Sequence, residues 1–305
     1  MDFKLHSENE KVNFSLFKNI DVYIKREDKL HEHISGNKYR KLKYNLIKAK
    51  EEHQETLLTF GGAYSNHIAA TAAAGEAFGF QTIGVIRGDE LVDKIDENPT
   101  LHFAAECGMH FKFVSREVYR KKATGQFLES LKKEFGDVCI LPEGGTNALA
   151  IKGCEEILQP DDAVFDYISV AVGTGGTISG LINSAMKHQK ILGFPALKGD
   201  FLEEEIYKLT GKRENLQLVH DYHFGGYGKI NTALVAFINQ FREETNIPLD
   251  PVYTGKMMYG LAAMSRNGFF STGTKILAIH TGGLQGIKGM NIHLKRKGYP
   301  LIDIE

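Results

Sequence analysis

The stretch YISVAVGTGGTISGLINSAMKHQ, residues 167–189, decides the fold of this chain. Its first six residues are an apolar, β-rich run, and they lead into the glycine turn Gly173-Thr174-Gly175-Gly176-Thr177. A helical pattern follows at residues 177–189, and another apolar run at residues 190–194. A strand, a helix and a second strand in this order predict two parallel strands, because parallel strands need a crossover connection between them.

The same alternation extends over nearly the whole chain. Strands are predicted at residues 22–25, 56–60, 82–87, 112–114, 139–141 and 275–280, and helices at residues 65–79, 99–107, 125–135 and 148–158. Alternating strands and helices imply parallel sheets with covered faces, so the predicted class is α/β. The length of 305 residues suggests two domains or one large α/β domain. Residues 196–228, charged and then aromatic, are the hardest to interpret.

Composition excludes several classes of partner. The chain has 37 Lys and Arg against 38 Asp and Glu, so it has no excess of positive charge for nucleic acid or an anionic membrane. No run approaches the length of a membrane-spanning helix. Cys107, Cys139 and Cys154 are widely spaced without a C-x-x-C pair, which indicates buried small residues in a reducing compartment. We therefore expect a cytoplasmic protein.

One lysine is a candidate nucleophile. Lys38 lies in the short polar segment Ser35-Gly36-Asn37-Lys38-Tyr39-Arg40-Lys41, which follows a strand-like run and holds two further cations. Like charges crowded together push an amine toward its neutral form, and a neutral amine is what forms a Schiff base. Clustered lysines more often belong to a solvated surface, so a functional role for Lys38 is favoured only together with the glycine turns described next.

Three glycine turns follow predicted strands. They are Gly61-Gly62-Ala63-Tyr64-Ser65-Asn66-His67, the turn at residues 173–177, and His280-Thr281-Gly282-Gly283. The first two precede helices, whose N-termini present unpaired N–H groups to anions. In an open α/β sheet all three lie at the carboxyl ends of strands, where ligands bind. The turn at 173–177 suits a phosphate, and Ser65 to His67 suit a carboxylate or hydroxyl.

Two other phosphate motifs are excluded. A dinucleotide fingerprint would need a third glycine where Ile178 stands and an acidic residue at the end of strand 190–194. A P-loop would need a Gly-Lys-Ser/Thr sequence, which does not follow the turn. The simpler alternative is three ordinary strand–helix turns. His67 and His280 have no carboxylate or cysteine at metal spacing, so no metal is expected.

At this point the motifs resemble a known family. Seven occur in the family's order between about residues 20 and 285: Lys25-Arg26-Glu27-Asp28, Gly36-Asn37-Lys38-Tyr39-Arg40-Lys41-Leu42, Ser65-Asn66-His67, Pro142-Glu143-Gly144-Gly145-Thr146-Asn147, the turn at 173–177, Asp250-Pro251-Val252-Tyr253-Thr254-Gly255-Lys256, and His280-Thr281-Gly282-Gly283. The chain resembles the pyridoxal-phosphate-dependent D-cysteine desulfhydrase and 1-aminocyclopropane-1-carboxylate deaminase group.

The resemblance implies a fold and a cofactor. The fold is the tryptophan-synthase-β-like, type II fold of pyridoxal-phosphate enzymes, with two open, mainly parallel sheets and helices on both faces. Residues 1–43 and 148–305 would form the larger, cofactor-binding domain, and residues 44–147 the smaller one. Lys38 would carry the aldehyde of pyridoxal 5'-phosphate and Asn66 would bind its 3-hydroxyl. The phosphate would lie on Gly173, Thr174, Gly175, Gly176 and Thr177, with Lys41. Dimers are usual in the family, so a homodimer is expected.

The resemblance also bears on the reaction. Deaminases of the group pair the pyridine nitrogen with a Glu and have a Leu in the last motif, whereas this chain has Thr254 and Thr281 at those places. A neutral hydroxyl does not stabilise a protonated ring as a carboxylate does, so the cofactor is a weaker electron sink. That favours α,β-elimination from D-cysteine to pyruvate, sulfide and ammonia. Opening the cyclopropane to give 2-oxobutanoate and ammonia is the alternative.

Three more residues complete the predicted site. Ser65 would hold the substrate carboxylate or assist proton transfer, Tyr227 would stack near the cofactor, and Tyr253 would join the catalytic group. Tyr227 lies in a segment, Gly226-Tyr227-Gly228, that departs from the family by continuing into Lys229-Ile230. The simpler alternative places both tyrosines in an ordinary core. Two further alternatives are a non-catalytic protein that binds the cofactor and a phosphate-sugar enzyme that uses the same turns.

Overall fold

The structure contains two separate sheets. The computed structural model describes residues 1, 3, 5–212 and 214–304. The larger sheet has the strand order β1 (Asn9–Val12), β2 (Ile20–Lys25), β10 (Thr274–Ile279), β7 (Tyr167–Val172), β8 (Lys190–Pro195) and β9 (Leu216–Leu218). Only the β1–β2 pair in this sheet is antiparallel. The smaller sheet is wholly parallel, in the order β5 (His110–Val114), β4 (Gln81–Arg87), β3 (Thr56–Gly61) and β6 (Cys139–Leu141).

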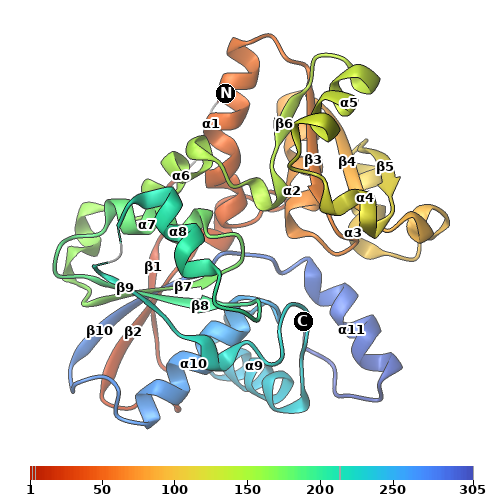
Figure 1. Ribbon diagram of the computed structural model, residues 1–305. Helices are drawn as coiled ribbons and strands as arrows, with labels where there is room; N and C mark the ends of the chain where they lie inside the picture. Colours follow the sequence, from red (N-terminus) through yellow and green to blue (C-terminus); the bar gives the residue numbers. More distant parts are fainter. Residues whose placement is uncertain (2, 4, 213, 305) are drawn as a thin grey trace.

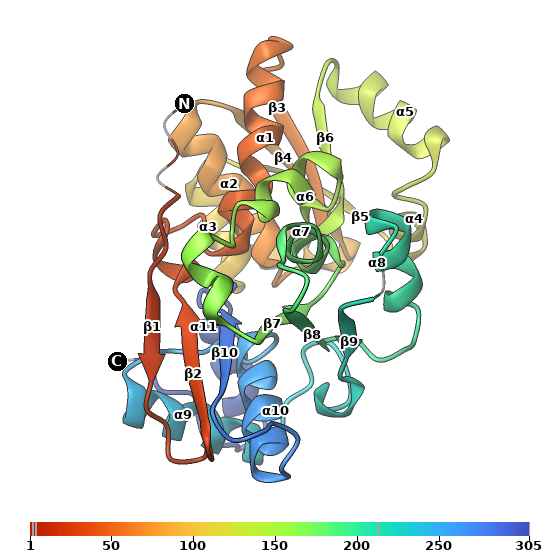
Figure 2. The same cartoon turned by 90° about the vertical axis from the view of Figure 1, so that its left-hand side faces the viewer.

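Helices surround both sheets, as Figures 1 and 2 show. They are α1 (Asn37–Glu51), α2 (Asn66–Phe78), α3 (Pro99–Glu106), α4 (Arg116–Arg120), α5 (Gly125–Phe135), α6 (Ala148–Glu155), α7 (Gly176–Ser184), α8 (Leu202–Thr210), α9 (Thr232–Thr245), α10 (Thr254–Arg266) and α11 (Gly286–Arg296). Short 3₁₀ turns lie at Glu27–Lys29, Asp89–Lys94, Glu143–Gly145, Pro160–Val164 and His220–Tyr222. Two mainly parallel sheets covered by helices confirm the predicted fold class.

The larger sheet is buried on both faces. In β10, Ile276 and Ala278 belong to a core shared with α9 and α10, whereas Leu277 and Ile279 belong to a core shared with α7. The alternation follows from the strand period, since successive side chains point to opposite faces. Burial on both faces explains why these strands read as continuous apolar runs in the sequence. None of the described helices is long and apolar enough to cross a membrane.

The predicted strands coincide with observed ones, but several helix boundaries differ. Helix α7 ends at Ser184 rather than at residue 189. The Gln189 side chain, which is almost fully buried, accepts from Met186 N and donates to the carbonyls of Asp162 and Phe165, so residues 185–189 form a tight turn before β8. Helix α6 ends at Glu155 rather than at 158.

Lys38 lies in the first turn of a fifteen-residue helix, α1, and not in a short polar segment. Helix α1 also contains the predicted domain boundary between residues 43 and 44. Its side chains Tyr39, Leu42 and Leu46 pack in the same core as Leu57 of β3. The division into residues 1–43 with 148–305 and residues 44–147 stays a prediction.

Candidate active site

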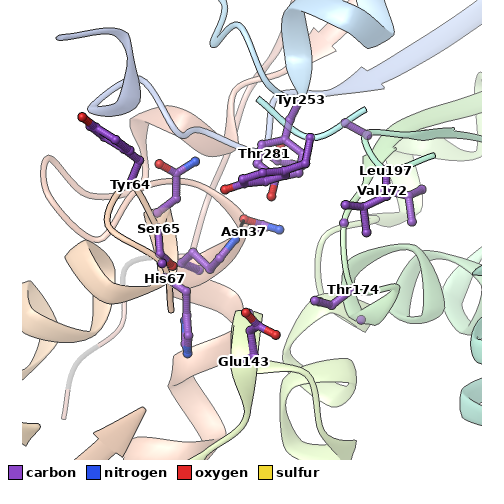
Figure 3. A pocket seen from close by; sticks show the side chains of 18 of the residues that line it. Asn37, Tyr64, Ser65, His67, Glu143, Val172, Thr174, Leu197, Tyr253 and Thr281 are labelled. Carbon is purple, nitrogen blue, oxygen red and sulfur yellow. Dashed lines mark hydrogen bonds between the residues drawn. The ribbon is translucent and has the colours of Figure 1, made fainter. Parts of the chain in front are cut away.

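A cavity of about 660 Å³ lies where the carboxyl ends of strands from both sheets meet. Its lining includes residues that end or follow β3, β4, β6, β7, β8 and β10, namely Gly62, Arg87, Glu143, Gly173, Leu197 and Thr281. This edge of parallel sheets is where ligands bind in open α/β folds. Figure 3 shows Ser65 and His67 on one side of the cavity, Val172 and Thr174 on the other, and Asn37 between them.

Lys38 lines this cavity at the start of α1. The preceding residue, Gly36, has φ +60°, and a Cβ there would lie 2.1 Å from Thr281 O, so only glycine allows the chain to enter α1 at this point. Burial and then the Lys41 charge lower the pKa of Lys38 from 10.5 to about 7, against opposing effects of Cys154 and Asp250. The amine is therefore divided between charged and neutral forms near pH 7.

Asn37 links Lys38 to the glycine turn of α7. Its Oδ1 accepts a hydrogen bond from Lys38 Nζ at 3.1 Å, and its Nδ2 donates to Thr177 Oγ1 at 2.7 Å. These two bonds define the orientation of the Asn37 amide and hold the amine beside the turn. The sequence reasoning did not single out Asn37, although it stands inside the quoted Gly36-Asn37-Lys38 motif.

The turn at residues 173–177 and Lys41 form an anion-binding cradle. Gly175, the N-cap of α7, has φ +84°, and the helix that follows directs its first amides to the cavity. A Cβ on Gly176 would lie 2.7 Å from Thr146 Oγ1 and 3.1 Å from Lys41 Nζ. Lys41 Nζ donates to Gly144 O at 2.8 Å and to Thr146 Oγ1 at 3.0 Å, and burial lowers its pKa to about 8. Backbone amides beside a lysine fit the phosphate of pyridoxal phosphate.

The start of α2 contributes Ser65 and Asn66. Ser65 caps this helix, because its Oγ accepts from Ile68 N at 3.3 Å, and its own proton remains available to a ligand. Asn66 Oδ1 accepts from Gln285 Nε2, so its amide N–H groups are left to donate. A donor at this place fits the oxygen of the cofactor ring, as the sequence comparison with the family predicts for Asn66.

Two tyrosines form another part of the cavity wall. The rings of Tyr227 and Tyr253 meet edge to face, with centroids 6.2 Å apart. Burial and then the neighbouring Tyr227 raise the pKa of Tyr253 well above its usual value, so its phenol remains protonated and can donate a hydrogen bond. Both residues line the cavity, and Tyr253 also packs against the core of the larger sheet.

Thr254 is the one predicted site residue that does not line the cavity, whereas Thr281 does. The Thr254 hydroxyl is fully buried, donates to Asp250 Oδ1 at 2.8 Å and accepts from Asp250 N at 2.9 Å. The Asp250 carboxylate also accepts from the amides of residues 252–254. Thr254 and Asp250 therefore bond to each other at the start of α10. Of the two threonines Thr254 and Thr281, only Thr281 lines the cavity.

His67 has an unusual environment in the cavity wall. It is 2% exposed, and neither ring nitrogen has a hydrogen-bond partner among the described residues. Burial, then the Lys38 and Lys41 charges, hold the pKa of His67 well below its usual value, so the ring is neutral. The described residues contain no group of three or more His, Cys, Asp or Glu that could hold a metal ion. His67 instead borders the cavity beside the two lysines.

The smaller sheet adds charged residues that the sequence reasoning missed. Arg87 ends β4, Glu143 follows β6, and Glu90 pairs with Arg116 at 2.5 Å; all four side chains line the cavity. Glu143 accepts from Tyr119 Oη at 2.7 Å and pairs with Lys122 at 3.2 Å. The position of Arg87 at the carboxyl end of a predicted parallel strand was the available signal.

Comparison with known proteins agrees with this site. Residues 12–282 match the pyridoxal-phosphate dependent enzyme family. The bifunctional mitochondrial D-cysteine desulfhydrase/1-aminocyclopropane-1-carboxylate deaminase of Arabidopsis thaliana is 32% identical, over 88% of this chain and 73% of that protein. The D-cysteine desulfhydrase of Serratia proteamaculans is 27% identical, over 86% of each chain. A crystal structure of an ACC deaminase homologue has a TM-score of 0.75 and 30% identity, over 96% of this chain and 92% of that one.

These matches cover most of the chain, including the lysine, the glycine turns and the strand ends that form the cavity. Backbone amides at 173–177, the Lys41 cation and the Lys38 amine are groups whose chemistry suits such a cofactor. This chain belongs to the pyridoxal-phosphate dependent enzyme family, in its 1-aminocyclopropane-1-carboxylate deaminase and D-cysteine desulfhydrase group, and is a pyridoxal-phosphate-dependent lyase or deaminase.

Proposed function

We propose that the protein catalyses α,β-elimination from a small amino acid, with D-cysteine as the foremost substrate and pyruvate, sulfide and ammonia as products. The observation that carries the proposal is the place of Lys38. Its amine, partly neutral near pH 7, lies in a cavity that also holds the anion cradle of α7 and the Lys41 cation. Such an amine serves as a nucleophile toward an aldehyde and as a base toward a C–H proton.

Each of three cavity residues, Lys38, Ser65 and Tyr253, has its own role in the proposed reaction. Pyridoxal phosphate, when bound, supplies an electron sink for the pair that the α-proton leaves behind. Lys38 would hold the aldehyde of the cofactor through Nζ, and the same Nζ would accept the α-proton of the substrate. Ser65, at the N-terminus of α2, binds the α-carboxylate. Tyr253, whose phenol stays protonated, offers its O–H to the departing sulfide.

The preference for elimination over ring opening rests on the carboxylates of the cavity. Those that line it, Glu90 and Glu143, both belong to the smaller-sheet side. On the larger-sheet side Thr281 offers a neutral hydroxyl, and the nearby Asp250 is engaged by the start of α10. A ring nitrogen beside a hydroxyl withdraws fewer electrons than one beside a carboxylate. That suffices to lose an α-proton and a good leaving group.

Absorbance spectra and steady-state assays test the proposal. The purified holoenzyme should release pyruvate from D-cysteine and 3-chloro-D-alanine, and 2-oxobutanoate from the cyclopropane amino acid slowly or not at all. Efficient release of 2-oxobutanoate would overturn the choice of reaction. A bound chromophore with no turnover of any of the three would favour a non-catalytic protein.

The assignment of Lys38 has its own test. Lys38→Ala should lose the long-wavelength absorbance, and borohydride should label Lys38 in the unaltered protein. Lys256→Ala is the control, because this lysine also has a lowered pKa of about 8 but lies outside the cavity lining. A label found on Lys41 or Lys256 would show that another amine carries the cofactor.

A further inference from the structure

Arg87 is placed to meet a ligand in the cavity. It is the last residue of β4, and its side chain lies against the loop between β3 and α2. A Cβ on Gly62 of that loop would lie 3.4 Å from Arg87 Nη2, and the same loop leads to Ser65. The guanidinium therefore borders the place where the α-carboxylate of the substrate is expected, on the side of the smaller sheet.

The Arg87 charge has no carboxylate partner among the described residues, although two glutamates share the cavity. Glu90 is paired with Arg116 at 2.5 Å. Glu143 accepts from the Tyr119 hydroxyl and pairs with Lys122. Both carboxylates are thus engaged elsewhere, and the five N–H donors of Arg87 remain available to a ligand.

The buried ring of Tyr119 supports the Arg87 side chain. Its guanidinium carbon lies 5.8 Å from the centroid of the Tyr119 ring, within the range of a cation–π contact. Tyr119 is only 3% exposed, and its hydroxyl is held by Glu143. A guanidinium held above a fixed ring presents a planar fork, and this geometry matches a carboxylate or sulfonate.

The charges of the expected ligands leave one cation unmatched. The cofactor phosphate is assigned to the α7 cradle and Lys41, and the α-carboxylate of the substrate to Ser65 at the start of α2. Arg87 borders the second of these positions, but neither assignment requires its charge. A third negative group, carried by the far end of the substrate, would complement it.

We propose that Arg87 binds a carboxylate or sulfonate on the β-substituent of the substrate, so that the preferred substrates are cysteine conjugates with an anionic thiol group. This inference rests on the proposed elimination. The Cα–H and Cβ–S bonds break, the α-proton goes to Lys38 Nζ, and the thiol leaves with its own anionic group. Water then converts the remaining three-carbon fragment to pyruvate and ammonia, and no other reactant is needed.

The decisive experiment compares two substrates of almost equal shape. S-carboxymethyl-D-cysteine carries the added charge, and S-carbamoylmethyl-D-cysteine replaces that carboxylate by a neutral amide. The holoenzyme should show a kcat/KM higher by about tenfold to a hundredfold for the charged substrate, the range expected of a hydrogen-bonded ion pair. In Arg87→Gln this ratio should fall toward one, and in Arg87→Lys it should be partly restored.

Two results would overturn the inference. A ratio near one in the unaltered protein would mean that the cavity does not recognise the added charge. An unchanged ratio in Arg87→Gln, with equal losses on both substrates, would place Arg87 on the α-carboxylate instead. Arg116→Gln is the matched control, because Arg116 is a cavity arginine that already has a carboxylate partner, and it should leave the ratio unchanged.

A binding measurement separates this inference from the proposed reaction. Calorimetry on the holoenzyme should show that glutarate binds more tightly than its half-amide glutaramate, and that Arg87→Gln removes the difference. A preference for glutarate without turnover of any cysteine derivative would contradict the elimination and leave the anion site standing. Turnover of D-cysteine without a preference for glutarate would contradict only the role of Arg87.

Discussion

Gln285 Nε2 donates a hydrogen bond to Asn66 Oδ1 at 2.5 Å, and Gln285 Oε1 accepts another from Thr100 Oγ1 at 3.0 Å. The residue just before α11 is thus connected to the starts of α2 and α3, which lie beside the smaller sheet. Since Asn66 Oδ1 accepts from Gln285, the N–H groups of Asn66 Nδ2 are left to donate to a ligand. A residue outside the cavity lining therefore orients the Asn66 amide in the cavity wall.

We expect Gln285→Leu to weaken cofactor binding, because Asn66 loses the donor that defines its orientation. The loss should be about 1 kcal/mol, or about fivefold in affinity, as for one hydrogen bond. Fluorescence titration of the apoprotein with pyridoxal phosphate measures it. Thr100→Val is the control: it removes the other bond of Gln285 and keeps the bond to Asn66, so its effect should be smaller. Equal effects would assign Gln285 a merely structural role.

The cradle of α7 can be tested with two glycines of similar backbone conformation. Gly175 and Gly211 have φ of +84° and +67°, and neither would bring a Cβ closer than 3.3 Å to another residue. Alanine at either position should cost about 1 kcal/mol of folding free energy, because the left-handed region disfavours a Cβ. Only Gly175→Ala should also weaken cofactor binding. Equal cofactor retention in both variants would place the phosphate elsewhere.

Thr254 and Thr281 should behave differently although both were predicted near the pyridine nitrogen. Thr254→Val leaves Asp250 N without an acceptor and removes one donor from its carboxylate, so it should lower the free energy of unfolding by about 1–3 kcal/mol. Thr281→Val should lower kcat by about tenfold and leave stability nearly unchanged. Urea unfolding and steady-state kinetics on the two variants check this, and the reverse pattern would contradict the placement of Thr254 outside the cavity.

The lysines of the cavity predict how stability depends on pH. The folded apoprotein lowers the pKa of Lys38 to about 7 and of Lys41 to about 8, whereas both titrate near 10.5 when unfolded. Between these values the unfolded chain binds more protons, so the free energy of unfolding should rise with pH, by at most about 1.4 kcal/mol per unit for each lysine. Below pH 7 this gain is absent.

Urea titrations of the apoprotein at pH 7.5 and 9 measure that rise. Lys38→Met should reduce the slope, since it removes one of the lysines with a lowered pKa and retains much of the side chain's volume. Lys256→Met should reduce the slope as well, so it tests whether the effect follows from burial rather than from a place in the cavity. That variant removes another buried lysine, with a pKa of about 8, which lies outside the cavity. If neither variant changes the slope, other groups govern it.

The sequence by itself determined the fold class, most of the cavity and eight of the ten described strands, all but β1 and β9. Strand β7, the glycine turn and the start of α7 are adjacent in the chain, and their pattern depends on local geometry: the strand period, the φ of Gly175 and the exposed amides of a helix N-terminus. The order of such units places every strand-end turn at one edge of a parallel sheet. For that reason Lys38, Ser65 and the turn at 173–177 were predicted before any distance was known.

Only the tertiary structure decided which side chains of those segments reach the cavity. Thr254 follows Tyr253 directly, yet its hydroxyl turns to Asp250 while Tyr253 lines the cavity. Gln285 bonds to Asn66, which lies 219 positions earlier in the chain. Arg87 has no carboxylate partner among the described residues, because Glu90 and Glu143 bind other side chains. A sequence pattern records the period of each element, but the partner of a side chain depends on how distant elements pack, and that is a property of the folded chain alone.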